Sequence, residues 1–227
     1  MNFRVTEDAL RLGIKVIVIT IKGIRNTIDN EEFNELKLNT LKEIRSSLSL
    51  NNIENDKILS GFWKLHEKVG NIDGKEVPSP VSLLTTLLTT EGLPYINLIV
   101  DIYNLVSIKT RLSIGAHDIS KIAGNVTLTI TENNETFLPI GYIYPKVINK
   151  GEYVYIDDSK EILCRMEVKQ SENTKVDETT TDCLYIIQGN EFTSAEYIKE
   201  AAHQLINLTT KYCGGTAEII YNTHSIG

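Results

Sequence analysis

The chain has 227 residues, of which 41% are hydrophobic and 23% are charged, so it can bury a full core without disulfides or metals. Its net charge is −7: residues 1–70 carry eleven Lys and Arg against ten Asp and Glu, and the rest carries twelve against twenty. Because broad binding to nucleic-acid backbones depends on neutralising phosphates, this balance argues against a protein that grips long RNA or DNA. It still allows one terminal nucleotide to be held.

The three cysteines, Cys164, Cys183 and Cys213, are odd in number and widely spaced. They fit neither a disulfide framework nor a zinc site, and no metal or other cofactor is expected. The amino terminus has early acidic residues and no apolar signal core, and the longest apolar run is shorter than the ~20 residues of a membrane span. We therefore expect a cytoplasmic protein that does not enter a membrane.

The first part of the chain predicts one strand and two helices. Residues 14–21 carry β-branched side chains on both faces, as in a well-buried strand. The Asp-Asn pair at 29–30 caps a helix predicted over residues 31–48. Apolar spacing predicts a second helix over residues 54–68, and His66 lies near its end, where a surface or capping role is expected.

Residues 70–80 concentrate turn-forming side chains and mark the best internal boundary of the chain. We expect a single domain, residues 1–227, in which residues 1–70 form an N-terminal α/β subregion. A further helix is predicted over residues 81–89.

The longest apolar helix pattern covers residues 97–108 and leaves one polar seam, made of Asn97, Asp101 and Asn104. A helix that is apolar nearly all round is buried. Because an unpaired buried polar group costs roughly 1–3 kcal/mol, each seam residue needs a partner. The nearest candidate is the segment 113–118, which we predict as a polar loop.

The remainder of the chain predicts short strands, one long helix and a final strand. Strands and helices intermingle without a regular βαβ repeat, so the predicted fold class is α+β, a mixed sheet with packed helices. The predicted strands cover residues 125–131, 135–138, 152–156, 161–168, 182–187 and 217–221, and the helix covers residues 195–212.

Two segments carry candidate chemistry, and the first is 113–118. His117 beside Asp118 suggests a base with an orienting carboxylate, and Gly115 and Ala116 offer backbone amides that a substrate can approach closely. The alternative is that Asp118 caps the turn that follows it.

The second segment covers residues 162–170. Strand alternation would place Cys164 and Met166 on one face and Arg165 and Glu167 on the other. Arg165 could hold a phosphate or carboxylate bidentately, or it could pair with Glu167 in solvent. Cys164 lacks a neighbouring base, so a buried thiol is the alternative to a nucleophile.

The run INLIVDIYNLV at 96–106, followed by SIGAHD, resembles the helix and loop of the editing module, the B-three/B-four domain, of the phenylalanyl-tRNA synthetase beta subunit. The family patterns are INNVVDxTNYV and PLHAFD. The resemblance extends to Pro78-Ser79-Pro80, to the Ile-Asp-Asp run at 156–158 and to residues 174–186, so it covers about residues 77–190. Residues 211–215 look more like the short free-standing relatives of the module.

This resemblance implies recognition of the aminoacyl-adenosine at the acceptor end of a tRNA, with hydrolysis of a mischarged ester in trans. The family's histidine aligns with Gly115, and its glutamate, which recognises a tyrosine hydroxyl, aligns with Ile186. Tyrosyl-tRNA should therefore be a poor substrate. We expect His117 and Gly115 to be catalytic, and substrate contacts from Asn97, Asp101, Asn104, Ala116, Asp118, Cys164, Arg165, Glu167 and Ile186.

Two other functions stay open on the sequence. One is a non-catalytic module that binds RNA, a small ligand or a protein partner, which the acidic charge and the loss of the family's glutamate at Ile186 favour. The other is a structural domain whose polar seam only fixes the neighbouring loop. Membrane and DNA partners are not expected, and the sequence does not indicate an oligomeric state.

Overall fold

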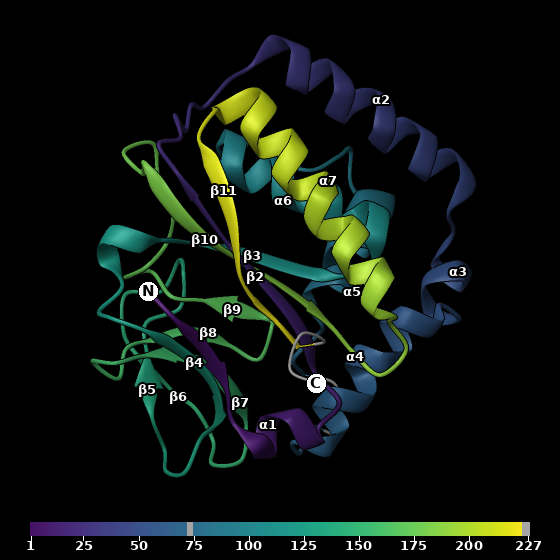
Figure 1. Cartoon of the computed structure of the whole chain (residues 1–227). Coiled ribbons are helices and arrows are strands. Elements are labelled where there is room, and N and C mark those ends of the chain that lie inside the picture. Colours follow the sequence, from purple (N-terminus) through teal and green to yellow (C-terminus); the bar gives the residue numbers. More distant parts are fainter. Residues whose placement is uncertain (72–74, 224–227) are drawn as a thin grey trace.

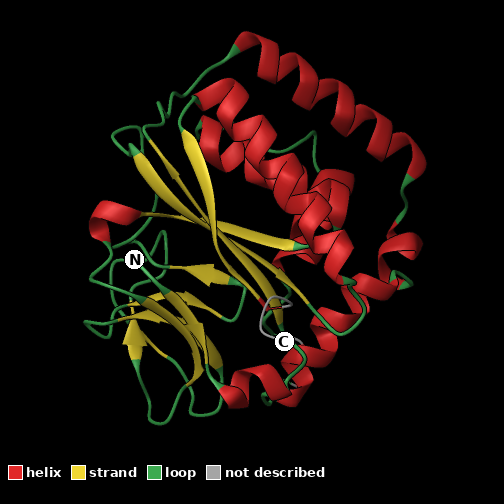
Figure 2. Cartoon of the chain, in the orientation of Figure 1, coloured by secondary structure: helices red, strands yellow, loops and turns green. Residues whose placement is uncertain are grey.

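Two β-sheets share a hydrophobic core, and helices cover the outer face of one of them (Figures 1 and 2). The structure is a computed structural model that describes residues 1–71 and 75–223. It has the α+β class that the sequence predicts, with one antiparallel and one mixed sheet. Within the described ranges, no helix is both long enough and apolar enough to cross a membrane.

The first sheet has four antiparallel strands in the order β11-β2-β10-β3. Its central strand β2 is buried on both faces because Ile17, Ile19 and Ile21 point toward the helices while Val16 and Val18 point toward the second sheet. The strands are β2 (Lys15–Lys22), β3 (Ser113–Asp118), β10 (Asp182–Gly189) and β11 (Thr216–Asn222).

The second sheet has five strands in the order β1-β4-β7-β8-β9, and only the β1/β4 pair is parallel. It packs against the first sheet through side chains such as Leu128, Tyr155 and Leu163. A separate two-stranded hairpin joins β5 to β6. The bounds are β1 (Phe3–Val5), β4 (Val126–Ile130), β5 (Thr136–Phe137), β6 (Lys146–Val147), β7 (Tyr153–Asp157), β8 (Ile162–Arg165) and β9 (Lys169–Gln170).

Helices α6 and α7 pack against each other and on the four-stranded sheet, and α2 crosses outside them (Figure 1). In α6, eleven of the 13 residues are buried, as its nearly continuous apolar surface predicts. The helices are α1 (Glu7–Arg11), α2 (Glu31–Ser47), α3 (Leu50–Glu54), α4 (Lys57–Lys68), α5 (Ser79–Thr89), α6 (Leu98–Thr110) and α7 (Ala195–Cys213), with a 3₁₀ turn η1 (Ile119–Lys121).

Three predictions about local structure were wrong. The segment 113–118 is strand β3, because pairing with β10 compensates for its weak strand signal. The helix predicted over 54–68 is confirmed as α4, but its predicted start was wrong: α4 begins at Lys57, because the Asp56 side chain accepts from the amides of Ile58 and Leu59. Residues Leu50–Glu54 form a separate short helix, α3. The strand predicted over 161–168 stops at Arg165, since Met166 adopts a left-handed backbone with φ 46°.

Residues 1–70 do not form a separate layer. Strand β2 pairs with β10 and β11, and β1 pairs with β4, so this subregion supplies a strand to each sheet. Part of the predicted boundary, residues 72–74, lies outside the described residues.

Candidate functional site

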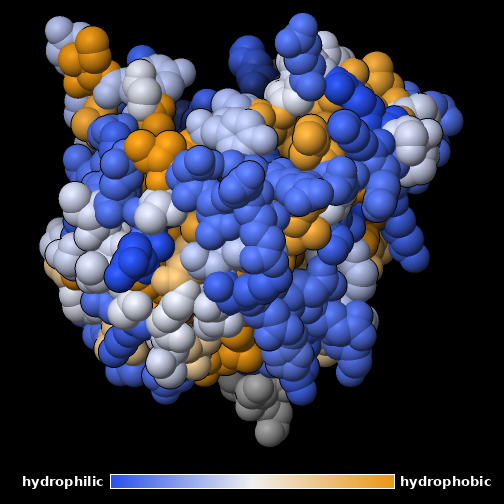
Figure 3. Space-filling view, turned by 90° about the horizontal axis from the view of Figure 1, so that it is seen from above, coloured by the Kyte–Doolittle hydropathy of each residue, from blue (hydrophilic) through white to orange (hydrophobic). Residues whose placement is uncertain are grey.

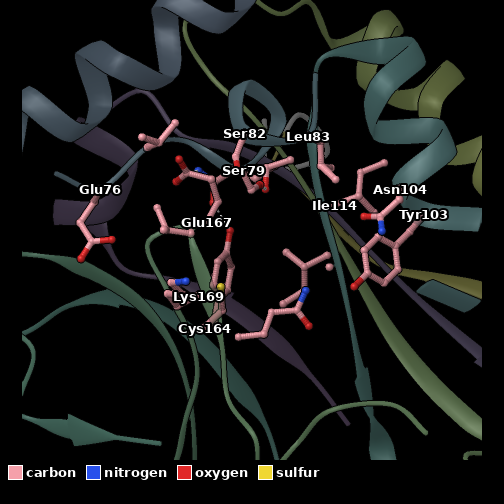
Figure 4. Close-up of a pocket in the computed structure, with 18 of the residues that line it drawn as sticks. Glu76, Ser79, Ser82, Leu83, Tyr103, Asn104, Ile114, Cys164, Glu167 and Lys169 are labelled. Carbon is pink, nitrogen blue, oxygen red and sulfur yellow. Dashed lines mark hydrogen bonds between the residues drawn. The ribbon is translucent and has the colours of Figure 1, made fainter. Parts of the chain in front are cut away.

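A cavity of about 600 Å³ opens beside β3, at one edge of the four-stranded sheet. Strands β3 and β10 form one wall, the β8–β9 turn forms the opposite wall, and α5 and α6 close a third side (Figure 4). In that view Ser79 and Ser82 lie above the cavity, Cys164 and Lys169 below it, and Tyr103 to the right. Many lining side chains carry hydroxyl, amide or carboxylate groups, including Ser79, Ser82, Tyr103, Asn104, Glu167, Gln170 and Gln188.

Strand β3 builds its wall of the cavity through simple alternation. Ile114 and Ala116 pack in the core beneath the helices, and Gly115 and His117 line the cavity from the opposite face; Ile114 also reaches the cavity lining. The hollow over Gly115 is filled by another residue, because a Cβ placed on Gly115 would lie 2.8 Å from Nε2 of Gln170. Gly115 therefore makes room for the carboxamide of Gln170.

Gln170 also meets Tyr103 from α6. Burial raises the pKa of Tyr103 to about 12, and a hydrogen bond with the Gln170 side chain opposes that rise. The Tyr103 hydroxyl therefore keeps its proton at physiological pH. A carboxamide and a phenol thus stand together in front of Gly115.

The backbone amide of Gly115 belongs to the sheet. The Asp118 amide donates to the Thr174 carbonyl, on the side of β3 away from β10. Because successive amides of a strand point to opposite edges, the Gly115 amide points toward β10 and the Ala116 amide points away from it. The Gly115 amide is thus directed at the neighbouring strand, and a catalytic role for Gly115 stays a prediction.

His117 is almost fully buried, and its Nδ1 lies 3.0 Å from the Thr174 hydroxyl. Burial lowers the pKa of His117 to about 3. The imidazole is therefore neutral throughout the physiological range. It can accept or donate a hydrogen bond in the cavity, but it is a weak base.

A buried network surrounds Glu167 at the base of the β8–β9 turn. Its carboxylate lies 2.6 Å from Nε2 of His66 and accepts hydrogen bonds from the Tyr153 hydroxyl and, at 3.4 Å, from the Gln188 amide. Tyr155 extends the network by donating to the Gln188 carbonyl at 2.5 Å. Burial would lower the pKa of His66, but the charge of Glu167 and their hydrogen bond outweigh it and raise that pKa.

Comparisons with known proteins identify the region that holds this cavity. A profile of the B3/4 domain matches residues 68–214, more than half of the chain. The chain belongs to the B3/4 domain family.

This B3/4 domain is similar to part of phenylalanine–tRNA ligase beta subunits. It is 28% identical over 137 residues to the subunit of Fusobacterium nucleatum and 30% identical over 128 residues to that of Mycoplasma genitalium. These matches cover 60% and 56% of this chain but only 16% and 15% of the two subunits. The chain therefore spans a small part of the length of these relatives.

A solved structure shares the fold. An N-terminal fragment of the phenylalanyl-tRNA synthetase beta-subunit from Pyrococcus horikoshii matches with a TM-score of 0.52 and 15% sequence identity. The match covers 95% of this chain and 50% of that fragment. At this identity the similarity concerns the fold alone.

In the B3/4 domain, more than half of the site residues predicted from the sequence meet at the cavity. Within the described part of the chain, the cavity is lined by Asn104, Gly115, His117, Cys164, Glu167 and Ile186. Burial, together with the charge of Glu167, raises the pKa of Cys164, so its thiol stays protonated and is a poor nucleophile.

The other residues predicted to contact a substrate lie elsewhere. Asn97 caps α6 by accepting from the Val100 amide at 3.1 Å, and Asp101 lies 3.1 Å from Nζ of Lys37 on α2. Asp101 thus ties α6 to α2, and its predicted bond to segment 113–118 was wrong. Ala116 is buried in the core on the helix side.

Asp118 and Arg165 are also structural. Asp118 accepts from the Ser120 amide at 2.9 Å and caps η1, as the alternative interpretation predicts. Arg165 forms ion pairs at 2.5 Å with both Glu152 and Glu76, and these hydrogen bonds raise its pKa against the effect of burial. The predicted sharing of a solvent face with Glu167 was wrong.

Sequence reasoning missed the partners of Glu167 and the residue that covers Gly115. His66 was expected at the surface or at a cap, yet it is fully buried. Its contact with Glu167 joins residues 101 positions apart, and Gln170 reaches Gly115 across the cavity. No local spacing could have indicated either contact.

Proposed function

We propose that this B3/4 domain binds the aminoacylated acceptor end of a tRNA and hydrolyses a mischarged aminoacyl ester in trans. The observation that carries the proposal is the cavity. All its lining residues lie between Lys75 and Gln188, inside the region that matches the family. Its volume of about 600 Å³ suits a ligand of the size of an aminoacyl-adenosine, since such pockets measure roughly 300–1,000 Å³.

Hydrolysis of an aminoacyl ester requires that water and the ester be well positioned more than it requires a strong nucleophile. A water oxygen forms a bond to the ester carbonyl carbon, the bond from that carbon to the ribose oxygen breaks, and the amino acid and the ribose hydroxyl are released. Neutral His117 would accept a hydrogen bond from the water. Gln170 and Tyr103 would donate to the carbonyl oxygen as it gains charge.

The lining also bears on which amino acid is removed. Ile186 is paired with Gly115 in the β3–β10 ladder, lines the cavity and offers no acceptor for a phenolic hydroxyl. A site built to bind a hydroxyl discriminates strongly, and an isoleucine cannot do so. We expect small or apolar aminoacyl esters to be hydrolysed faster than a tyrosyl ester.

The second candidate is a non-catalytic module that binds RNA or a small ligand. The specific observation in its favour is the protonation state of His117 and Cys164, the two side chains that the sequence suggests as a base and a nucleophile. His117 has a pKa of about 3, and burial holds the thiol of Cys164 in its protonated form. A pocket with neither a base near neutrality nor a thiolate can still hold a ligand tightly.

The test is deacylation of a panel of aminoacyl-tRNAs by the wild type, His117→Ala and a matched control, His203→Ala. His203 is an exposed histidine on α7 outside the cavity. We expect hydrolysis of at least one ester, a slower rate for His117→Ala and no change for His203→Ala. Binding of an aminoacyl-adenosine analogue without hydrolysis of any ester would favour the second candidate, and equal rates in all three proteins would move the site elsewhere.

A further inference from the structure

The loop between β5 and β6 exposes a series of apolar and aromatic side chains. On the face shown in Figure 3, hydrophobic residues form small patches among hydrophilic ones, as is usual for a protein surface. In the segment 139–145, which we call the aromatic loop, Ile143 is 85% exposed, Tyr144 76% and Tyr142 43%. Consecutive exposed side chains of this kind indicate a binding surface.

The base of the aromatic loop is attached to strand β9. The Ile140 amide donates to the Gln170 carbonyl at 2.9 Å, and the Glu172 amide donates to the Leu138 carbonyl at 2.8 Å. Within the loop, the Tyr142 amide donates to the Pro139 carbonyl at 3.0 Å. An anchored loop presents its rings at a lower entropy cost than a free one.

The same attachment places the aromatic loop at the cavity. Tyr142 is one of the lining residues, and the loop is bonded to the backbone of Gln170, whose side chain covers Gly115. A ligand that fills the cavity therefore meets Tyr142, and the exposed Ile143 and Tyr144 follow it in the same loop.

The charges around this entrance favour an anion. Nζ of Lys146 lies 4.9 Å from the centre of the Tyr142 ring, and Lys169 lines the cavity with no carboxylate partner in the described part of the chain. Of the nearby carboxylates, Glu76 and Glu152 share Arg165, Glu172 is paired with Lys175, and Glu167 is hydrogen-bonded to His66. Lys146 and Lys169 therefore remain available to an anionic ligand, although the chain has a net charge of −7.

We propose that the aromatic loop is a stacking platform for the unpaired nucleotides that precede the aminoacylated adenosine. This inference rests on the proposed function. Tyrosine rings stack on nucleobases of any sequence, and each stacked base strengthens binding by roughly five-fold to a hundred-fold. Stacking requires no extensive phosphate neutralisation, so it allows an acidic protein to bind an RNA end. The lysines at the entrance favour this occupant over an apolar peptide.

The test compares a long and a short ligand. The long one is an RNA minihelix with an unpaired 3′ end that carries an amide-linked amino acid, and the short one is the corresponding aminoacyl-adenosine amide. The adenosine amide fills the cavity but does not extend over Ile143 and Tyr144, neither of which lines the cavity. Affinities are measured for the wild type and for Tyr144→Leu, Tyr144→Phe and Ile28→Ser.

Tyr144→Leu keeps an apolar side chain but loses the aromatic face, so it should weaken minihelix binding by about ten-fold while affecting the adenosine amide far less. Tyr144→Phe should bind the minihelix like the wild type. Ile28→Ser is the matched control, since Ile28 is 56% exposed and lies outside the cavity lining.

Equal minihelix affinity in Tyr144→Leu and the wild type would overturn the inference. If Tyr144→Leu changes the self-association of the protein and leaves RNA affinity unchanged, the inference is likewise overturned. If the wild type binds the adenosine amide but does not favour the minihelix, the platform fails while the cavity remains. If the wild type binds neither ligand, the proposed function itself fails.

Discussion

The side chain of Gln170 occupies the space in front of Gly115, with its Nε2 2.8 Å from the position that a Cβ would take. Gly115 has an ordinary strand backbone, so the glycine is required by this contact and not by its conformation. Any side chain at position 115 must displace the carboxamide from Tyr103 and from the cavity.

We therefore predict that Gly115→Ala displaces the Gln170 carboxamide and abolishes ester hydrolysis, while its cost in stability stays below the roughly 1–3 kcal/mol of core overpacking, because the end of a flexible side chain can move. The double variant Gly115→Ala/Gln170→Ala should recover the remaining loss of stability, because the second change removes the close contact. If the double variant also recovered activity, Gln170 would have no role in the reaction. Urea unfolding and deacylation rates measure the two effects separately.

His117 should make the protein less stable in acid. Its pKa is about 3 in the folded state and near 6.5 in the unfolded state, so between these values the unfolded chain binds more protons. The free energy of unfolding should therefore fall as the pH drops from about 6.5 toward 3. His117→Asn should flatten this slope in unfolding experiments from pH 4 to 7, and an unchanged slope would contradict the assigned burial.

The same pKa means that His117 does not produce a change of rate between pH 6 and 8. We predict that the pH–rate profiles of the wild type and His117→Asn have the same shape there, even where their absolute rates differ. A profile that loses an inflection in the variant would place the pKa of His117 near neutrality.

The effect of the His66–Glu167 pair on stability should be opposite to that of His117, because this pair stabilises the fold more at acid pH than at alkaline pH. The folded pKa of His66 is raised above its unfolded value, so its stabilising contribution is complete below about pH 6.5 and is lost as the pH rises through the folded pKa. Glu167→Gln leaves burial as the main influence, so the pKa of His66 should drop below its usual value. NMR titration of His66 measures this shift, and a value unchanged by the substitution would remove Glu167 as its cause.

The ion pair between Lys37 and Asp101 links α2 to α6. Both side chains are 3% exposed, so Asp101→Ala leaves a buried ammonium without its partner and should cost about 3–5 kcal/mol. The double variant Lys37→Met/Asp101→Leu should recover most of that loss. In the single variant, amide hydrogen exchange should become faster in α2 and α6 and change less in segment 113–118, because Asp101 does not contact β3.

RNA affinity should depend weakly on salt. If Lys146 and Lys169 are the principal phosphate contacts, the slope of log K against log salt should lie between about −1 and −2. Titrations of the minihelix from low to physiological salt measure it. A slope several times steeper would require cations that the entrance to the cavity does not provide.

The sequence predicted the elements whose signal is local. Strand β2 and helix α6 carry apolar patterns that are complete within themselves, and both formed where they were expected. Strand β3 has a glycine at 115 and a charged residue at its end, and it is a strand only because β10 pairs with it. A contribution from about 70 residues away along the chain leaves no trace in the local pattern.

The residues of the candidate site also fall into two groups: those that the sequence could predict and those that it could not. Gly115, His117 and Ile186 could be found because they fall on a recognisable family pattern, and all three line the cavity. His66 and Gln170 could not be found, because each acts through a contact between distant segments. The sequence indicated which segments contain the site, and the tertiary contacts decide which side chains reach it.

The central position of β2 also constrains how the chain is made. Ile19 pairs with Tyr185 on one side and with Ile219 on the other, so this interior strand waits for partners that are synthesised much later. During translation its two apolar faces have no sheet to enter until β10 emerges from the ribosome. A protein with such distant pairings should fold slowly and should depend on chaperones that shield the nascent amino-terminal third.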